Sequence, residues 1–162
     1  MKLKQFLYLL AVVPFIFSSC KKDDDYRDKF EGTYDTEKVG FEAFVVNDEV
    51  YSTPVKDNEV IIVNKLGANQ LMLTIGKEFI IVTVNEQGNL TIPTESYSLP
   101  TQIDPDTGDR ITINFTITRT GNITSKTLYI KETLSGDALI EGNGQKILAD
   151  ITGTTAYNGT KK

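Results

Sequence analysis

Residues 110–119 read Arg-Ile-Thr-Ile-Asn-Phe-Thr-Ile-Thr-Arg, and apolar and polar side chains alternate through the whole stretch. Successive side chains of a β-strand point to opposite faces. The alternation therefore places Ile111, Ile113, Phe115 and Ile117 on one face, with threonine and asparagine on the other. We expect a strand whose apolar face meets a core or a ligand and whose polar face meets water.

The rest of the chain after Phe30 shows the same pattern in shorter form. Apolar residues alternate before Pro93, in the run 128–130 and in the run 147–151, and no window of ten or more residues has apolar positions at helical spacing. Pro93 has no backbone N–H, so its strand should end there or lie at an edge. The pattern is typical of an all-β domain.

Short turn signals separate these runs, and each supplies a residue that accepts a positive φ. Strands joined by such short links must pair as antiparallel neighbours, because a parallel return needs a crossover of a dozen or more residues. The sequence therefore predicts an antiparallel meander of about eight strands. The predicted turns are Gly67-Ala68-Asn69, Gly76-Lys77, Gln87-Gly88-Asn89, Thr107-Gly108-Asp109, Thr120-Gly121-Asn122 and Gly142-Asn143-Gly144.

Two segments, 59–63 and 79–84, are apolar at successive positions and so have two apolar faces. A strand of this kind needs cover on both sides. We expect Phe41, Phe44 and Val46 to cover the outer face within the same molecule. The alternative is that this face meets a partner or a ligand.

Composition excludes several kinds of chemistry. The chain has 162 residues, no His, no Trp, one Cys and a formal net charge of −5. Without His or a second Cys there is no Ser-His-Asp or Cys-His pair, no His-ligated metal and no internal disulfide. The negative charge also disfavours non-specific nucleic-acid binding, which depends on Lys and Arg.

The first twenty residues have the parts of a secretory signal. Lys2 and Lys4 precede an apolar run of about a dozen residues, which is shorter than the roughly twenty that span a bilayer. The segment is therefore interpreted as a cleaved signal peptide, residues 1–19. Its ending, Phe17-Ser18-Ser19-Cys20, resembles a bacterial lipobox, which implies that Cys20 carries a diacylglycerol thioether. An ordinary signal with an incidental Cys is the alternative.

The residues after Cys20 are Lys21, Lys22, Asp23, Asp24 and Asp25. They resemble the export signal of Bacteroidetes surface lipoproteins, which implies an outer-membrane protein on the cell surface. The same residues also suit a solvated, charged tether, and both interpretations hold together. Residues 20–29 are thus expected to form a lipidated tether and residues 30–162 a single all-β domain.

The pattern Phe30-x-Gly32-x-Tyr34 then opens the domain. Together with the lipobox and the tether, this order resembles a recurrent class of small Bacteroidetes lipoproteins, many of which have no assigned activity. The resemblance implies a small lipocalin-like, or calycin-like, barrel or half-open barrel, with a β-sandwich as the alternative. The chain lacks the lipocalin tryptophan and a C-terminal helix, which argues against a deep ligand cavity.

Residues 104–109, Asp-Pro-Asp-Thr-Gly-Asp, resemble a calcium loop in their alternate Asp residues. The spacing then fails, because Gly108 and Phe115 stand where further oxygen ligands are required. We expect an Asp-rich turn and no metal or other cofactor.

Carboxylates are the remaining candidates for catalysis, but Glu132, Asp137, Glu141 and Asp150 show no spacing typical of an acid and nucleophile pair. The tyrosines could form a platform for a sugar or peptide, or could simply be half-buried strand residues. They are Tyr34, Tyr51, Tyr97, Tyr129 and Tyr157.

The sequence therefore predicts a lipid-anchored, surface-exposed, non-catalytic binding or accessory lipoprotein. Its partners would be the membrane, through Cys20, and a small apolar or glycan ligand or a surface protein. A structural or shielding envelope protein without a ligand is the first alternative, and a carboxylate hydrolase is the second. An open-mouthed cavity lined by Ile111, Ile113, Phe115 and Ile117 would favour binding, whereas a solid core would favour the structural role.

Overall fold

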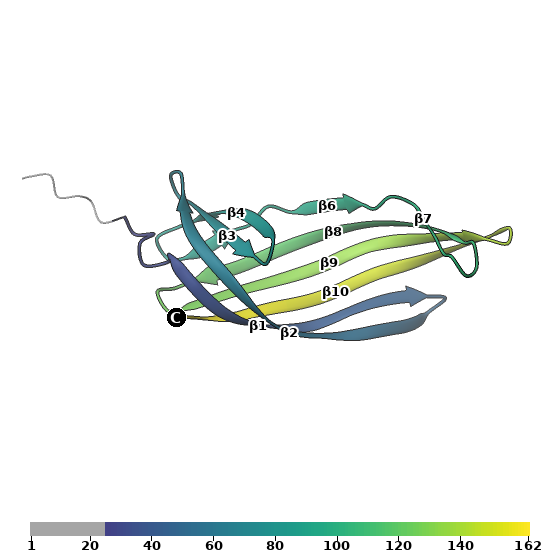
Figure 1. Cartoon of the computed structure of the whole chain (residues 1–162), viewed down its shortest axis with the longest axis horizontal. Coiled ribbons are helices and arrows are strands. Elements are labelled where there is room, and N and C mark those ends of the chain that lie inside the picture. Colours follow the sequence, from purple (N-terminus) through teal and green to yellow (C-terminus); the bar gives the residue numbers. More distant parts are fainter. Residues whose placement is uncertain (1–24) are drawn as a thin grey trace, which may run out of the picture.

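The structure is a computed structural model that describes residues 25–162. In this range the chain forms one antiparallel sheet of ten strands (Figure 1). No helix within the described range is long and apolar enough to cross a bilayer. The strands are β1 (Gly32–Val46), β2 (Glu49–Leu66), β3 (Gln70–Ile75), β4 (Glu78–Val84), β5 (Asn89–Thr91), β6 (Glu95–Ser98), β7 (Gln102–Ile103), β8 (Arg110–Ile123), β9 (Thr127–Gly142) and β10 (Gln145–Lys161).

Eight of the strands close into a barrel. Each of β1 to β4 pairs with the strand that follows it, β8 pairs with β9, β9 pairs with β10, and β1 pairs with β10. The ring closes where Asn89–Thr91 of β5 pairs with Thr120–Asn122 of β8. The expectation of an antiparallel all-β barrel is confirmed, and the sandwich alternative is wrong. The two further strands, β6 and β7, pair with β8 outside the ring.

The barrel is closed at one end of the long strands only. β3 pairs with β2 only over Ile61–Leu66, and β5 pairs with β8 only near the C-terminal end of β8. Beyond these contacts β1, β2, β8, β9 and β10 run on together as a curved sheet, with β6 and β7 along one side (Figure 1). We call this part the extension; it comprises residues 36–46, 49–60, 95–103, 110–119, 132–142 and 145–155.

The closed barrel is filled by side chains. Tyr34 reaches across it and donates hydrogen bonds from its Oη to the carbonyls of Phe30 (2.9 Å) and Thr124 (3.2 Å). Burial of this phenol raises its pKa to about 12. Alternate residues of every barrel strand point inward and pack together, as the period of two requires. The core residues are Phe30, Tyr34, Ile61, Val63, Leu71, Leu73, Ile80, Val82, Val84, Leu90, Ile92, Ile123, Leu128, Ile130 and Tyr157.

One predicted turn is instead part of a strand. Thr120-Gly121-Asn122 lies inside β8, opposite Ile130 and its neighbours on β9. A Cβ at Gly121 would lie 2.5 Å from the carbonyl oxygen of Tyr129. This glycine therefore permits a close approach of two backbones rather than a reversal of the chain. The predicted end of the strand before Pro93 is confirmed, since β5 ends at Thr91.

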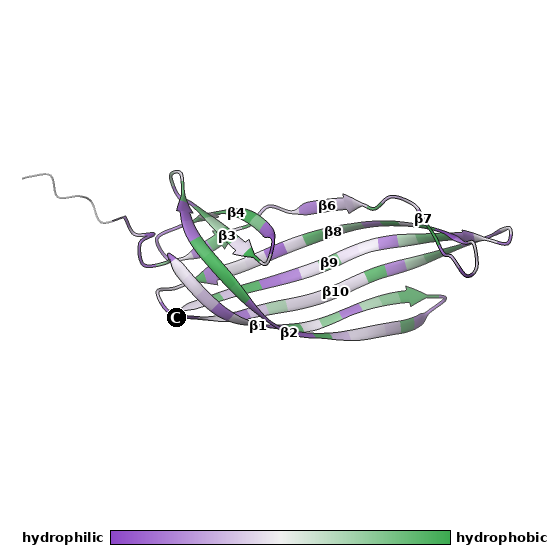
Figure 2. Ribbon diagram, viewed as in Figure 1, coloured by the Kyte–Doolittle hydropathy of each residue, from purple (hydrophilic) through white to green (hydrophobic). Residues whose placement is uncertain are grey.

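The predicted cover of the second apolar face is wrong. Ile80 and Val82 of β4 point into the core, whereas Phe79 and Ile81 remain 67% and 49% exposed. Phe41, Phe44 and Val46 belong to the extension and do not reach this surface. We call this surface the outer patch; it consists of Val60, Ile62, Phe79 and Ile81, all exposed, and β2 is strongly hydrophobic where it enters the barrel (Figure 2).

Residues 25–29, which the sequence places in the tether, lie against the closed end of the barrel. Tyr26 Oη donates to the Val84 carbonyl at 2.8 Å, and the guanidinium of Arg27 donates to the carbonyl of Gln70 at 3.2 Å. Lys65 forms ion pairs with Asp25 and Asp28. Phe30 then enters the core, so this segment caps the barrel and fixes where the preceding chain leaves it.

Candidate functional site: the open face of the extension

The four apolar residues of the opening stretch lie on the inner side of the extension. Ile111, Ile113, Phe115 and Ile117 are all half-buried. Every second residue of β8 after Ile117 also points inward, as far as Ile123, which is in the barrel core. The apolar residues of the extension therefore lie on the same side of the sheet as the barrel core, with Arg119 and Gly121 between Ile117 and Ile123.

Neighbouring strands widen this surface. Leu134 pairs with Ile117, and Ala138 pairs with both Ile113 and Ala149. Ala138, Ala149 and Ile151 are buried and pack with half-buried Val46, Ile113 and Leu134. We call the apolar inner surface of the extension the open face. Its members are Phe44, Val46, Ile111, Ile113, Phe115, Ile117, Leu134, Ala138, Ile140, Ile147, Ala149 and Ile151.

The open face lacks a cover among the described residues. Residues 49–60 of β2 pair with β1 on one side, and the pairing of β2 with β3 begins only at Ile61. On the opposite side, Tyr97 of β6 stacks on Phe115 with ring centroids 5.0 Å apart. Phe44 and Tyr97 remain 45% and 41% exposed. Exposed apolar surfaces are typical of interaction sites, which makes the open face the candidate site.

A layer of charged and polar groups separates the open face from the barrel core. Arg119 is only 6% exposed and contacts two carboxylates, with Nη1 2.6 Å from Glu95 Oε2 and Nε 2.5 Å from Glu132 Oε1. Glu132 Oε2 also accepts hydrogen bonds from Tyr157 (3.2 Å) and Thr155 (3.3 Å). The buried guanidinium is thus paired on both sides, as burial of a charge requires.

The pKa values in this layer follow from these contacts. Hydrogen bonds from Arg119 and from Tyr97 lower the pKa of Glu95. Burial alone would lower the pKa of Arg119, but its hydrogen bonds to the two glutamates outweigh this and raise it. Burial, followed by the charge of Glu132, raises the pKa of Tyr157. Glu95 and Arg119 are therefore both charged at neutral pH.

A cavity of about 210 Å³ lies between this layer and the open face. Arg119, Glu132, Thr155 and Tyr157 line its base, Ile117 and Leu134 lie on the side of the open face, and Lys38, Glu42 and Glu78 complete the wall. Lys38 Nζ is 5.2 Å from the centroid of the Tyr157 ring, a cation–π contact. The cavity can hold the polar end of a ligand whose apolar part rests on the open face.

The carboxylates that the sequence singled out are not all gathered at one place. Glu132 points inward, whereas Asp137 and Asp150 face each other across β9 and β10 on the outer side. Glu141 pairs with Lys146. Glu132 lies instead beside Glu95, and both are held by Arg119. Because its pKa is lowered, Glu95 stays ionised and is a poor proton donor.

Residues 104–109 form a turn. The Asp104 carboxylate accepts hydrogen bonds from the backbone N–H groups of Asp106 (2.8 Å) and Thr107 (3.1 Å), which lowers its pKa. Gly108 has a φ of 75° and donates to the Asp104 carbonyl. The Asp104 carboxylate is thus used inside its own turn, which explains an Asp at this position.

The tyrosines are not gathered in one platform. Tyr34 and Tyr157 are in the barrel core, and Tyr129 is exposed on the outer side. Tyr51 and Tyr97 lie on opposite borders of the open face, where Tyr51 is 57% exposed. Of the five, these two can contact a ligand on that face.

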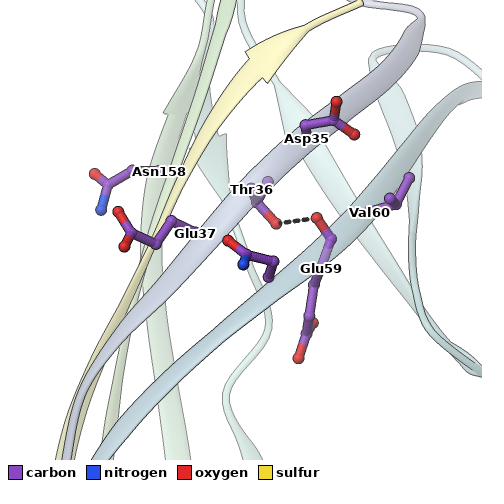
Figure 3. A pocket seen from close by; sticks show the side chains of 7 residues that line it. Asp35, Thr36, Glu37, Glu59, Val60 and Asn158 are labelled. Atoms are coloured by element: carbon purple, nitrogen blue, oxygen red, sulfur yellow. Dashed lines mark hydrogen bonds between the residues drawn. The ribbon is translucent and has the colours of Figure 1, made fainter.

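A second hollow, of about 420 Å³, lies on the outer side of β1 and β2 (Figure 3). Asp35, Glu37 and Asn158 line it, and Thr36 Oγ1 donates to the Glu59 carbonyl at 2.8 Å. Asp35 and Glu37 form ion pairs with Lys162 and Lys56. The hollow therefore offers exposed charges that already have partners, and we regard it as a weaker candidate than the open face.

The residues assigned to lipidation and export, Cys20 and Lys21 to Asp24, lie outside the described residues. Asp25 is described, and its carboxylate pairs with Arg27 at 2.8 Å. Hydrogen bonds from Arg27 lower its pKa.

Sequence reasoning missed the charged layer, although β8 carries a signal for it. Arg119 is two residues after Ile117 and therefore lies on the same face as Ile113, Phe115 and Ile117. The alternation thus predicts a charged side chain on the apolar face. Its partner Glu132 lies on another strand, and Glu95 lies on a short strand that the pattern does not reveal. The layer depends on strand register, which no local pattern specifies.

No family model matches the chain, and neither the curated proteins nor the solved structures searched gave a match.

Proposed function

We propose that this protein is a lipid-anchored, surface-exposed lipoprotein that binds a ligand or partner non-catalytically through the open face. The observation that carries the proposal is the structure of the extension. Its inner surface is apolar and faces the same side as the barrel core, yet it is open to solvent along both borders.

The filled barrel directs binding to the extension. A lipocalin-type mode needs a cavity inside the closed ring, but aromatic and aliphatic side chains occupy that space. A purely structural role leaves the exposed part of the half-buried apolar residues without a use, because apolar area in contact with water costs about 25 cal/mol per Å². Binding is the role that uses them.

The anchor would set the orientation of the molecule. Cys20 precedes Asp25 by five residues, which span at most about 18 Å. Residues 25–30 are fixed at the closed end, and the fourteen residues of β8 extend over roughly 46 Å from that end. A lipid on Cys20 would thus hold the closed end near the membrane and project the open face away from it.

Site-specific photocrosslinking in intact cells tests the proposal. Ile113, on the open face, is replaced with p-benzoylphenylalanine, and the neighbouring Thr112, on the outer face, serves as the matched control. Irradiation should give an adduct at position 113 and none at 112. A protein that is crosslinked at neither position, or equally at both, would contradict binding at the open face and favour the structural role.

A further inference from the structure

We propose that the open face receives an extended segment of a partner polypeptide in which basic and apolar residues alternate. This inference rests on the proposed function, since it names the occupant of the same site. Two observations carry it, the dimensions of the open face and the charge along its inner rim.

The dimensions suit an extended peptide. Ile111 and Ile117 are six residues apart on β8, which corresponds to roughly 20 Å. Six neighbouring strands, from β2 to β6 through β1, β10, β9 and β8, cover about 24 Å at a spacing of roughly 4.8 Å. The resulting area is about 480 Å², below the roughly 800 Å² that each partner buries in a stable protein–protein interface. A segment of six or seven extended residues fits this length.

The charge along the inner side is acidic. Arg119 is already neutralised by Glu95 and Glu132. Because side chains alternate between the two faces of each strand, four carboxylates lie on this inner side. They are Glu42 of β1, Asp57 and Glu59 of β2, and Glu78 of β4, and Lys38 lies opposite Asp57. Glu42 and Glu78 also line the cavity next to the open face. An occupant with positive charges would meet four carboxylates and a single lysine, Lys38, at the rim and hydrocarbon on the floor.

The same charge argues against the other occupants. A second copy of this chain would bring its own acidic rim against the first, and the chain as a whole carries −5. A fatty acid or an anionic lipid would place its headgroup beside Glu42 and Glu78. Basic side chains of an amphipathic segment are complementary to this rim, and complementary charge favours one class of partner over another.

A fluorescence titration tests the inference with the intact lipoprotein in phosphatidylcholine vesicles. The chain has no Trp, so Phe115→Trp introduces one reporter on the open face. Dansyl-labelled seven-residue peptides with alternating Leu and Lys, Leu and Glu, or Leu and Ser are added, and energy transfer from position 115 is recorded. The Leu-Lys peptide should bind at least about tenfold more tightly than the Leu-Glu peptide, and added salt should reduce the difference.

Matched variants separate local charge from net charge. Glu42→Gln, Asp57→Asn and Glu78→Gln together should weaken binding of the Leu-Lys peptide by about tenfold. Glu86→Gln, Asp137→Asn and Asp150→Asn remove the same number of negative charges away from the open face and should leave the affinity unchanged. All six side chains lie on the surface or near it, so folding should be maintained in both triple variants.

Each outcome decides one question. Equal affinity for the three peptides, or no effect of the Glu42, Asp57 and Glu78 changes, would overturn the inference while the open face remained a binding site. Binding of none of the peptides, together with a crosslinked adduct at position 113, would also overturn only the inference and leave a small ligand as the occupant. Absence of both peptide binding and the adduct would overturn the proposed function as well.

Discussion

Arg119 marks the residue at which the inner lining changes from barrel core to open face. On one side of it Ile123 is fully buried, and on the other Ile117 is half-buried. Its guanidinium is shared by Glu95 of β6 and Glu132 of β9, which joins a strand outside the ring to two strands of the ring. The two ion pairs of Arg119 therefore hold β6, and with it Tyr97, at the border of the open face.

The substitution Arg119→Met should destabilise the protein by about 2 kcal/mol. Loss of the guanidinium leaves the inward-pointing Glu132 without its cation, and removal of one partner of a buried ion pair usually costs about 3–5 kcal/mol. We expect less because Glu95 is one-third exposed and can be hydrated. Urea unfolding measures the change, with exposed Arg110→Met as the control. Equal stabilities of the two variants would contradict a buried role for Arg119.

The same contacts predict an acid-dependent loss of stability. The folded-state pKa of Glu95 lies below the ordinary glutamate value of 4.5, so its contribution is fully present above pH 4.5 and is lost as the pH falls through the lowered value. Glu95→Gln removes this term. The free energy of unfolding of this variant should thus fall less between pH 4.5 and 3 than that of the unmodified protein. Parallel pH profiles would show that Glu95 is not held by Arg119.

At the scale of the strand, local pattern predicts most of what is observed. The alternation in residues 110–119 correctly assigns both faces of β8, and the glycine and asparagine turns at Gly67, Gly76, Gly88 and Gly144 all have positive φ. The pattern fails at Gly121, where glycine serves close backbone packing. It also fails at the outer patch. A run that is apolar on both faces indicates that both faces should be covered, but it does not indicate which residues cover them.

Two adjacent residues of β4 test the assignment of its faces. Ile80 is 5% exposed and points into the barrel, whereas Ile81 is 49% exposed in the outer patch. Ile80→Ala should cost about 2–5 kcal/mol through the cavity that it leaves, and Ile81→Ala less than about 1 kcal/mol. Thermal or urea unfolding gives both values. A larger cost at Ile81 than at Ile80 would mean that the outer patch is covered in solution.

At the scale of the whole molecule, the sequence predicts an eight-stranded barrel but not its shape. That β3, β4 and β5 are short is visible in the spacing of the turns, and their shortness leaves residues 49–60 of β2 paired with β1 alone, so that the ring does not close over the extension. The pairing of β5 with β8, which closes the ring, joins segments about thirty residues apart, and no local signal specifies it. The four apolar residues of β8 were therefore identified from the sequence, whereas their exposure to solvent was not.

Cys20→Ser tests the proposed anchor. Acyl chains on this thiol would contribute about 0.8 kcal/mol per buried methylene and hold the protein on the membrane. The variant, which cannot form the thioether, should move from the envelope fraction to the soluble fraction, as followed by fractionation and immunoblotting. Retention of the variant in the envelope, without a change in its processing, would refute lipidation at Cys20.

Native mass spectrometry of the protein purified from its own envelope is the most direct test of binding at the open face. We expect a bound mass on the unmodified protein and on Thr112→Asp, and loss of that mass from Ile113→Asp, which places a charge on the apolar floor. Circular dichroism would show that both variants keep their strands. A bare protein mass in every sample, or a bound mass that survives Ile113→Asp, would refute binding at the open face.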